Sequence, residues 1–219
     1  MRCVGPAGTT PQLLAEGITT VTVHHPPHRS RGLRLPSPAT GSALPDGGLA
    51  RACAVAALRV VTGFVFLWAF LDKTFGLGYA TPAGKGWVDG GSPAGGFLAG
   101  VSAGPMRSTF HAWAGAAWVD WLFMLGLLGI GVAFAAGIAL RPAAVAGTLM
   151  TGLMWVAEWP PARHLADGSP SMSTNPFADY HLVYALVLIA LAAVSAGDVL
   201  GLGRIWAMLP VVRRTPWLR

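Results

Sequence analysis

The fold is indicated by a 20-residue apolar stretch that carries one charge, ACAVAALRVVTGFVFLWAFL at residues 52–71. A bilayer core about 30 Å thick is crossed by about 20 apolar residues in a helix, so this stretch is long enough to span a membrane. Its charge is Arg59, eight residues after Arg51 and therefore about 12 Å further along a helix. An arginine inside a membrane costs about 3 kcal/mol or more unless protein or the interface receives it, so Arg59 is a candidate functional residue.

Three further stretches meet the same length criterion. Together the four predict helices at residues 51–71, 118–140, 142–159 and 180–203. The chain is 53% hydrophobic and only 11% charged, which excludes an ordinary soluble domain. We therefore expect an all-α integral membrane protein, with one domain over residues 48–203 built as an up-down bundle of four transmembrane helices.

The basic residues predict the orientation of this bundle, because cytoplasmic segments of membrane proteins are enriched in lysine and arginine. We expect both termini in the cytoplasm and the bundle in the plasma membrane. The net charge of +6 then reflects topology, and no nucleic-acid partner is expected. The cytoplasmic side would carry Arg2, Arg29, Arg31, Arg34, Arg51, Arg141, Arg204, Arg213, Arg214 and Arg219, and the outer side Lys73, Lys85, Arg107 and Arg163.

The two ends of the chain lie outside the predicted bundle. Residues 1–47 are rich in Pro, Gly, Ser and Thr and predict a disordered cytoplasmic arm, whereas residues 204–219 predict a basic cytoplasmic tail. The histidines of segment 24–28 invite a metal interpretation, but prolines stiffen the segment and no acidic or cysteine partner is near. Cys3 and Cys53 show no metal-ligand spacing, so we predict no metal site, no haem attachment and no disulfide.

The loop between the first two helices is long and rich in glycine. No strand precedes these glycines and no GxGxxG or GKS/T motif occurs, which excludes the common nucleotide-binding loops. Apolar side chains recur through it, so we expect the loop to lie back on the helix ends, with a short interfacial helix near residues 106–113.

Arg59 and Lys73 fall on one predicted helix face, with Gly63 beside the arginine stem. Arg59 either faces the bundle centre, bonded to carbonyls or polar groups of other helices, or extends to the cytoplasmic headgroups. Lys73 is either a functional cation or an anchor at the membrane interface.

Topology brings a second set of ionisable residues to the outer membrane surface: Asp72, Lys73, Asp120, Glu158, Asp179 and His181. His181 is a candidate proton relay, because histidine commonly donates and accepts protons in proteins, and Glu158 is another candidate. The alternative is a ring of salt bridges that holds the helix ends together. Among the aromatic residues, Trp68, Trp159 and Tyr184 are candidates to stack on a flat ligand, although an aromatic belt explains such rings equally well.

Three blocks of this sequence resemble the DoxX family of membrane proteins, most closely members named after the large, DoxD-type subunit of thiosulfate:quinone oxidoreductase. The resemblance covers residues 51–203. The blocks are Arg59-x3-Gly63 with Phe66-Leu67-Trp68 and Asp72-Lys73-x-Phe75-Gly76-Leu77-Gly78; Trp118-x-Asp120-Trp121-Leu122; and Asn175-Pro176-x2-Asp179-Tyr180-His181-Leu182-x2-Ala185.

This resemblance implies a membrane subunit that oxidises thiosulfate to tetrathionate and passes the electrons to a quinone. From their positions, we expect Arg59, Lys73, Glu158 and His181 to carry the chemistry. A small partner subunit, a soluble oxidoreductase or a bound cofactor would be needed, because the chain lacks an evident redox centre of its own. The alternatives are a non-catalytic membrane scaffold for redox enzymes and a small-solute transporter. A homo-oligomer is compatible with each of these functions.

Overall fold

The computed structural model describes residues 47–171 and 173–219, which belong to one compact unit. The predicted disordered arm, apart from Gly47, and the histidines of segment 24–28 lie outside the described residues. Within those two ranges every regular element is a helix and no strand is present, so the predicted all-α class is confirmed there. A single β-bridge joins His164 to Pro170 in a loop.

Four apolar helices form the body of this unit: α1 (Gly47–Phe75), α4 (Ala117–Ala136), α5 (Leu140–Glu158) and α6 (Tyr180–Ala193). The first three are long and apolar enough to cross a membrane. The fourth has 14 residues and is therefore only about 21 Å long. The protein is thus an α-helical membrane protein with three candidate spans and one shorter apolar helix.

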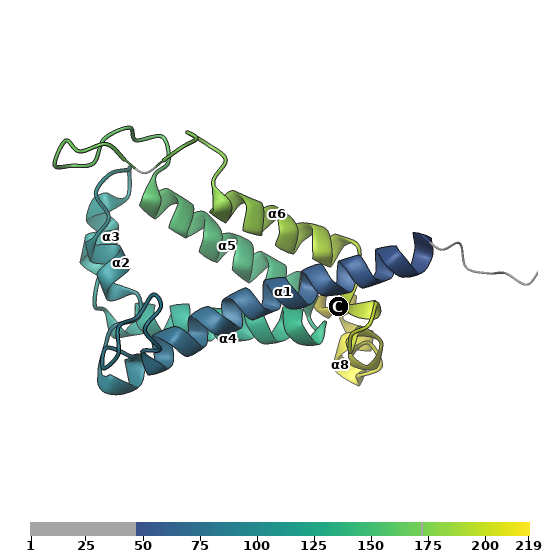
Figure 1. Ribbon diagram of the computed structural model, residues 1–219. Helices are drawn as coiled ribbons and strands as arrows, with labels where there is room; N and C mark the ends of the chain where they lie inside the picture. Colours follow the sequence, from purple (N-terminus) through teal and green to yellow (C-terminus); the bar gives the residue numbers. More distant parts are fainter. Residues whose placement is uncertain (1–46, 172) are drawn as a thin grey trace, which may run out of the picture. The chain divides into compact units, whose positions relative to one another are not determined.

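The helices associate in two pairs (Figure 1). Helix α1 packs along α4, and α5 packs along α6, while α4 and α5 meet through the short turn between them. The two pairs diverge from this turn, and α2 (Gly95–Ala99) and α3 (Arg107–Trp113) lie at the far end. The main core is apolar and draws on all four helices, with Phe66, Met124, Ile130, Phe134, Leu140 and Leu188 among its most buried members.

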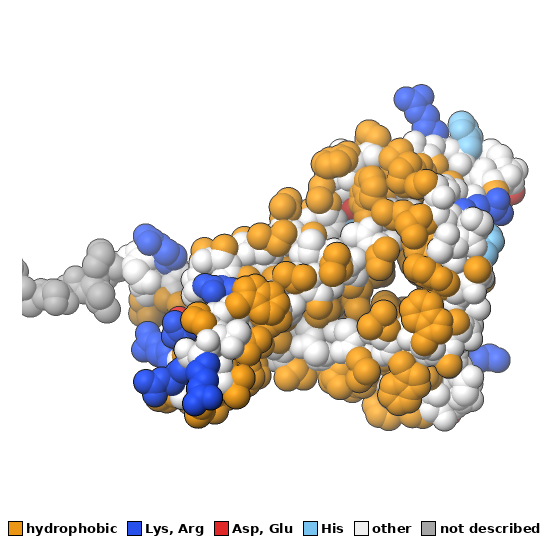
Figure 2. Space-filling view, turned by 180° about the vertical axis from the view of Figure 1, so that it is seen from behind, with side chains coloured by type: hydrophobic (Ala, Val, Ile, Leu, Met, Phe, Trp, Pro, Cys, Tyr) orange, Lys and Arg blue, Asp and Glu red, His pale blue; other side chains and the backbone are white. Residues whose placement is uncertain are grey.

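Large apolar side chains also cover the outside of the four helices. Figure 2 shows them along the helical face, whereas lysine and arginine side chains gather at the end that carries the C-terminal segment and the start of α1. A soluble protein rarely exposes so large an apolar surface, and a bilayer accounts for it. The exposed set includes Val61, Phe64, Leu122, Leu125, Leu149, Leu153, Val183 and Leu186.

Two helix ends differ from the sequence prediction. Helix α4 ends at Ala136, not residue 140, because Gly137 takes a left-handed conformation with φ 77° and ends the helix. Arg141, predicted to lie in the link, is in the first turn of α5. Helix α6 ends at Ala193, not residue 203, because residues 194–202 turn across the end of α4 and include left-handed conformations at Ser195 and Leu200.

The loop after α1 folds back on the helix ends, as predicted. Helix α3 confirms the short helix expected near residues 106–113, whereas α2 and the 3-10 turn η1 (Trp87–Asp89) were not foreseen. Leu98 and Phe110 pack against Ala157 at the end of α5 in a second, smaller core.

The C-terminal segment is folded as well. It contains η2 (Ala196–Asp198), α7 (Gly203–Trp206), α8 (Pro210–Arg214) and η3 (Pro216–Leu218). The indole N–H of Trp206 donates to the carbonyl of Leu218, 2.6 Å away, and the amide of Arg141 donates to the carbonyl of Arg219, 3.0 Å away. The predicted basic tail is therefore docked on the start of α5.

Candidate functional site

Arg59 lies inside the protein, with 1% of its surface exposed. Its Nη1 donates to the carbonyls of Phe134 and Ala135, at 2.7 and 2.8 Å. Its Nη2 donates to the carbonyl of Leu200, at 3.0 Å. The guanidinium therefore faces the bundle interior and binds backbone carbonyls, which is the first of the two arrangements predicted for it.

These contacts complete the C-terminal end of α4. The last four carbonyls of an α-helix have no partner within the helix. Here the carbonyl of Ala133 accepts from the amide of Gly137, Arg59 serves the next two, and the amide of Leu202 donates to Ala136 at 2.9 Å. The positive charge of Arg59 also lies at the negative end of the helix dipole. Arg59 is thus stabilised without any carboxylate partner.

Two glycines make this contact geometrically possible. A Cβ on Gly63 would collide with the backbone amide of Ala135, so the glycine lets α1 approach α4 closely one turn beyond Arg59. A Cβ on Gly137 would lie 2.7 Å from Nη1 of Arg59. Gly63 therefore makes room for the backbone of α4, and Gly137 is the glycine that leaves space for the guanidinium of Arg59.

The ionisable residues predicted to meet at the outer surface separate into two groups. Asp72 accepts hydrogen bonds from the amides of Tyr79 and Ala80, at 3.2 and 3.0 Å. Asp120 likewise accepts from the Ser92 hydroxyl and from the amide of Ala94, at 2.7 and 2.9 Å. Both carboxylates are buried and hold loop backbone on a helix end, which is a structural role.

Lys73 does not join the other candidate residues. Its Nζ lies 5.8 Å from the centre of the Phe123 ring on α4, and in the described part of the chain no carboxylate lies within 4.0 Å of it. The alternative of a salt-bridge ring around the helix ends is therefore not what the structure shows.

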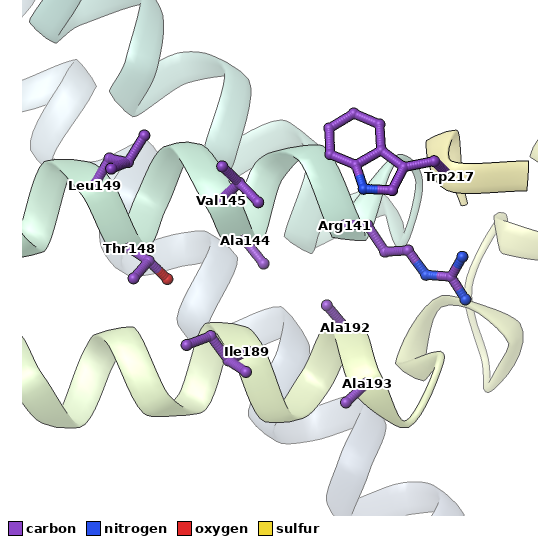
Figure 3. Close-up of a pocket in the computed structure, with 9 residues that line it drawn as sticks. All are labelled: Arg141, Ala144, Val145, Thr148, Leu149, Ile189, Ala192, Ala193 and Trp217. Atoms are coloured by element: carbon purple, nitrogen blue, oxygen red, sulfur yellow. The ribbon is translucent and has the colours of Figure 1, made fainter. Parts of the chain in front are cut away.

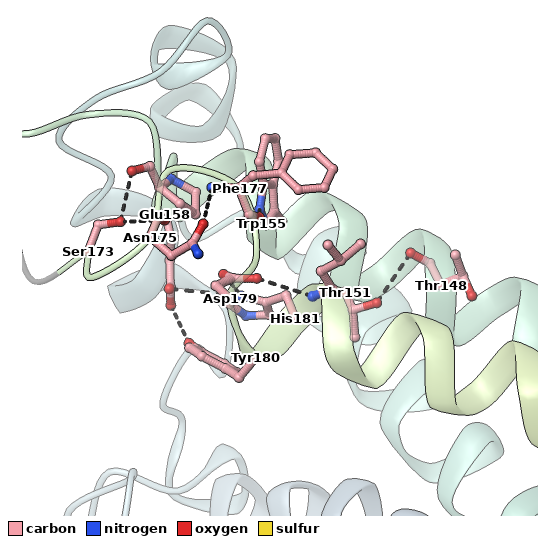
Figure 4. A network of polar contacts seen from close by, with 12 residues as sticks. Thr148, Thr151, Trp155, Glu158, Ser173, Asn175, Phe177, Asp179, Tyr180 and His181 are labelled. Carbon is pink, nitrogen blue, oxygen red and sulfur yellow. Dashed lines mark hydrogen bonds and ion pairs between the residues drawn. The ribbon is translucent and has the colours of Figure 1, made fainter.

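The second group, which we name the His181 cluster, consists of Glu158, Asp179, Tyr180 and His181 (Figure 4). Asp179 caps the start of α6, because its Oδ1 accepts from the amide of Leu182 at 3.1 Å. Its Oδ2 lies 2.9 Å from Nδ1 of His181, and Oε2 of Glu158 lies 3.8 Å from the same nitrogen. The Tyr180 hydroxyl donates to the other Glu158 oxygen at 2.6 Å.

The two nitrogens of the His181 ring have different surroundings. An ionised carboxylate only accepts hydrogen bonds, so the contact with Asp179 places a proton on Nδ1. Nε2 is buried and has no hydrogen-bond partner in the described structure, although the side chain is only 2% exposed. Such an orphaned polar atom is uncommon in a protein interior. His181 therefore has two carboxylates near Nδ1, while Nε2 is free to form a hydrogen bond.

Two residues near the His181 cluster, Asn175 and Trp155, were not among the predicted site residues. The side chain of Asn175 accepts from the amides of Phe177 and Ala178, both at 2.9 Å, and so shapes the approach to α6. The indole of Trp155 donates to the carbonyl of Phe177 at 2.9 Å and stacks edge-on against its ring. The Asn175-Pro176 pair in the third block was the available signal for this turn.

The three predicted stacking residues do not come together. Trp68 contacts Tyr79 beyond α1, Trp159 contacts Trp155 at the end of α5, and Tyr184 contacts Phe66 inside the bundle. Each ring pairs with another aromatic side chain. Of the three, Trp159 is nearest in sequence to the His181 cluster, directly after Glu158.

Ligand atoms of Glu158, Asp179 and His181 all lie within 4.8 Å of one another, a spacing that a metal ion could use. In this arrangement, however, each carboxylate already accepts a hydrogen bond from within the cluster. A metal on Nδ1 would have to displace the proton that Asp179 accepts. The hydrogen-bonded arrangement therefore explains the three groups without an ion.

Comparisons with known proteins give no relative from which function could be transferred: no family model matches the chain, and no curated protein or solved structure matches it. The DoxX resemblance therefore rests on the motif residues alone. Four of those residues are buried polar groups in this structure, namely Arg59, Asp72, Asp120 and His181.

Proposed function

We propose that the chain is a DoxX-like, four-crossing membrane subunit of a quinone-linked oxidoreductase. The fourth crossing would be α6 together with residues 194–202. Irregular backbone is tolerated at membrane depth where protein satisfies its polar groups. The hydrogen bonds to the carbonyl of Leu200 and from the amide of Leu202 support this assignment.

The proposed orientation places both termini in the cytoplasm, at the plasma membrane. Helix α4 alone spans about 30 Å with its 20 residues, so its end would lie near the cytoplasmic surface, and Arg59 with it. The first 12 residues of α1 extend beyond Arg59. The basic C-terminal segment would then face the anionic cytoplasmic leaflet, in agreement with the usual charge bias.

One observation supports the redox proposal. Nε2 of His181 has no partner, while Nδ1 of the same ring lies near the carboxylates of Asp179 and Glu158. Reduction of a quinone consumes two electrons and two protons. If thiosulfate is the donor, two thiosulfate ions form one sulfur–sulfur bond in tetrathionate and release those two electrons, which a partner subunit or bound cofactor would carry.

The residues of the chain would supply protons. Glu158 and Tyr180 are exposed and can exchange protons with solvent, whereas Nε2 of His181 is buried. The doubly protonated ring of His181 would deliver the proton on Nε2 to a quinone oxygen, while Nδ1 keeps the proton that Asp179 accepts. The second proton, and the proton that restores Nε2, would come from solvent. General acid catalysis of this kind contributes about 100-fold or more to a rate. Trp155, Phe177 and Trp159 would form the aromatic surroundings.

The experiment measures reduction of decylubiquinone and of a menaquinone analogue by the purified protein, with and without co-purifying subunits. Thiosulfate is tested beside a panel of other two-electron donors. We expect donor-dependent quinone reduction that H181Q abolishes and H111Q leaves intact, since His111 lies on α3 and binds the carbonyl of Val101. A folded protein that reduces no quinone with any donor contradicts the proposal.

A second candidate, a membrane scaffold for soluble redox enzymes, is favoured by the C-terminal surface. Leu200, Met208 and Val211 are each at least 66% exposed, and α8, which contains Val211, also carries Arg213 and Arg214. A scaffold would retain such an enzyme through this surface and would show no turnover of its own. Loss of a co-purifying enzyme in M208E, with no quinone chemistry in the wild type, would favour this function.

A further inference from the structure

A groove lies between α5 and α6, at the end of these helices that is remote from the His181 cluster (Figure 3). Its volume is about 360 Å³. Alanine side chains line its floor, because Ala144 and Ala192 are both buried and leave space between the helices. Branched apolar side chains line its walls, namely Val145, Leu149 and Ile189.

One end of the groove is cationic. Figure 3 shows Arg141 and Trp217 together there. Nη1 of Arg141 donates to the carbonyl of Pro216 at 3.1 Å, which fixes the side chain in place while it stays exposed. In the described ranges no carboxylate lies within 4.0 Å of its guanidinium, and Arg219 follows two residues after Trp217.

The groove also contains an unmatched polar atom. The hydroxyl of Thr148 is buried, lines the groove and has no hydrogen-bond partner. Its neighbour one turn on, Thr151, instead donates to the carbonyl of Gly147 at 2.9 Å. A hydroxyl left without a partner between two apolar helices points to a ligand that brings an acceptor oxygen into the groove.

We infer that this groove binds one anionic phospholipid from the leaflet that surrounds α5 and α6. The apolar walls fit an acyl chain, Arg141 fits a phosphate because guanidinium pairs with it through two hydrogen bonds, and Thr148 fits an ester oxygen. Basic pockets between membrane helices bind anionic headgroups in this way, and tryptophan favours the headgroup level. The inference requires the helices to face lipid but does not depend on the redox proposal.

The test uses native mass spectrometry of the full chain in detergent, after incubation with phosphatidylglycerol or with phosphatidylcholine of the same chain length. We expect phosphatidylglycerol to be retained more strongly. R141Q should weaken its retention about fivefold. R163Q serves as the matched control, because Arg163 is an exposed arginine in the loop that precedes α6 and should have no effect. Excess inorganic phosphate should not compete, since it lacks the acyl chain.

A second variant makes the result independent of charge. A193F places a ring in the groove from an exposed position and should abolish retention of both lipids while the thermal unfolding midpoint stays unchanged. Equal retention of the two lipids, unchanged by R141Q, would overturn the inference. So would a dimer that A193F converts to a monomer, because a second copy of the chain would then occupy the groove.

Discussion

Two buried cationic or titratable side chains, Arg59 and His181, lie in opposite parts of the molecule and have opposite kinds of surroundings. Arg59 donates to three backbone carbonyls at the end of α4 and in residues 194–202, with no acidic partner. His181 has two carboxylates on one ring nitrogen and nothing on the other. The two residues are equally hidden, at 1% and 2% exposed.

This difference indicates a structural role for Arg59 and a chemical role for His181. The Nη1 and Nη2 atoms of Arg59 are bound to fixed backbone carbonyls, although its Nε has no partner in the described structure, and removing the side chain would leave those carbonyls unpaired. A ring that is oriented by one carboxylate and still has a free nitrogen can accept or donate a proton without disturbing the fold. Arg59 is the more conspicuous residue in the sequence, yet His181 is the better candidate for reactivity.

The largest expected effect is the loss of stability in R59L. Three carbonyls would lose their partner in a buried place, at about 1 kcal/mol or more for each, so the free energy of unfolding should fall by about 3 kcal/mol or more. R59K should recover only part of this, because an ammonium lacks the planar fork that reaches both chain segments. Thermal unfolding in detergent measures both. An R59L protein as stable as the wild type would contradict the structural role of Arg59.

Next in size is the effect of H181Q on quinone reduction, a loss of about 100-fold with the unfolding midpoint unchanged. D179N should preserve the helix cap, since asparagine caps as well as aspartate, while it weakens the support of the ring. We therefore expect D179N to be stable and at least about tenfold slower. Stopped-flow quinone reduction checks both variants. A normal rate in H181Q removes His181 from the mechanism, and a normal rate in D179N removes the support by Asp179.

The contact that positions Arg59 is tested by G63A, which places a methyl group against the backbone of Ala135. Overpacking of this kind costs about 2 kcal/mol. G129A is the matched control, because a Cβ on that helical glycine meets no atom within 4 Å. The control should be neutral or slightly stabilising. Chemical or thermal unfolding curves that coincide for the two variants would show that α1 and α4 do not meet this closely.

A smaller effect is expected at Lys73, which was a candidate catalytic residue from the sequence. Its contact with the ring of Phe123 contributes about 0.5–1 kcal/mol. K73Q should therefore change the quinone reduction rate by less than about threefold. A loss as large as that of H181Q would return Lys73 to the active site and show that the two groups of residues act together.

The smallest effect concerns Asp167, in the loop before α6. The hydroxyl and amide of Ser169 donate to its carboxylate at 2.6 and 2.9 Å and hold the pKa of Asp167 below its ordinary value. The turn is then favoured while Asp167 is ionised and is lost as the pH falls through the lowered pKa. In a carbon NMR titration S169A should move the midpoint upward, with no change in overall stability.

Much of the fold could be predicted from the sequence, because apolar length is a strong signal. The predicted starts of α4, α5 and α6 agree with the structure to within two residues. The end of α6 could not be predicted, since residues 194–203 remain apolar and glycine-rich. That helix stops because the chain crosses the end of α4 and meets Arg59, which is a tertiary contact that no local pattern contains.

The candidate site was predictable in part. Up-down topology correctly placed Glu158 beside residues 179–181, because α5 and α6 are adjacent in sequence and antiparallel. The up-down topology could not show that Lys73 lies apart from Glu158 and residues 179–181, since its position depends on how far the two helix pairs diverge. It also could not identify the partners of Arg59, because backbone carbonyls are present at every residue and leave no mark in a sequence.

The different roles of Arg59 and His181 are tested most directly by measuring folding and quinone reduction on the same preparations of R59K and H181Q. We expect R59K to lose activity only in proportion to its folded fraction, whereas H181Q should be fully folded and about 100-fold less active. An R59K protein that is folded but inactive, or an H181Q protein that is folded and active, would contradict the assignment of structure to Arg59 and chemistry to His181.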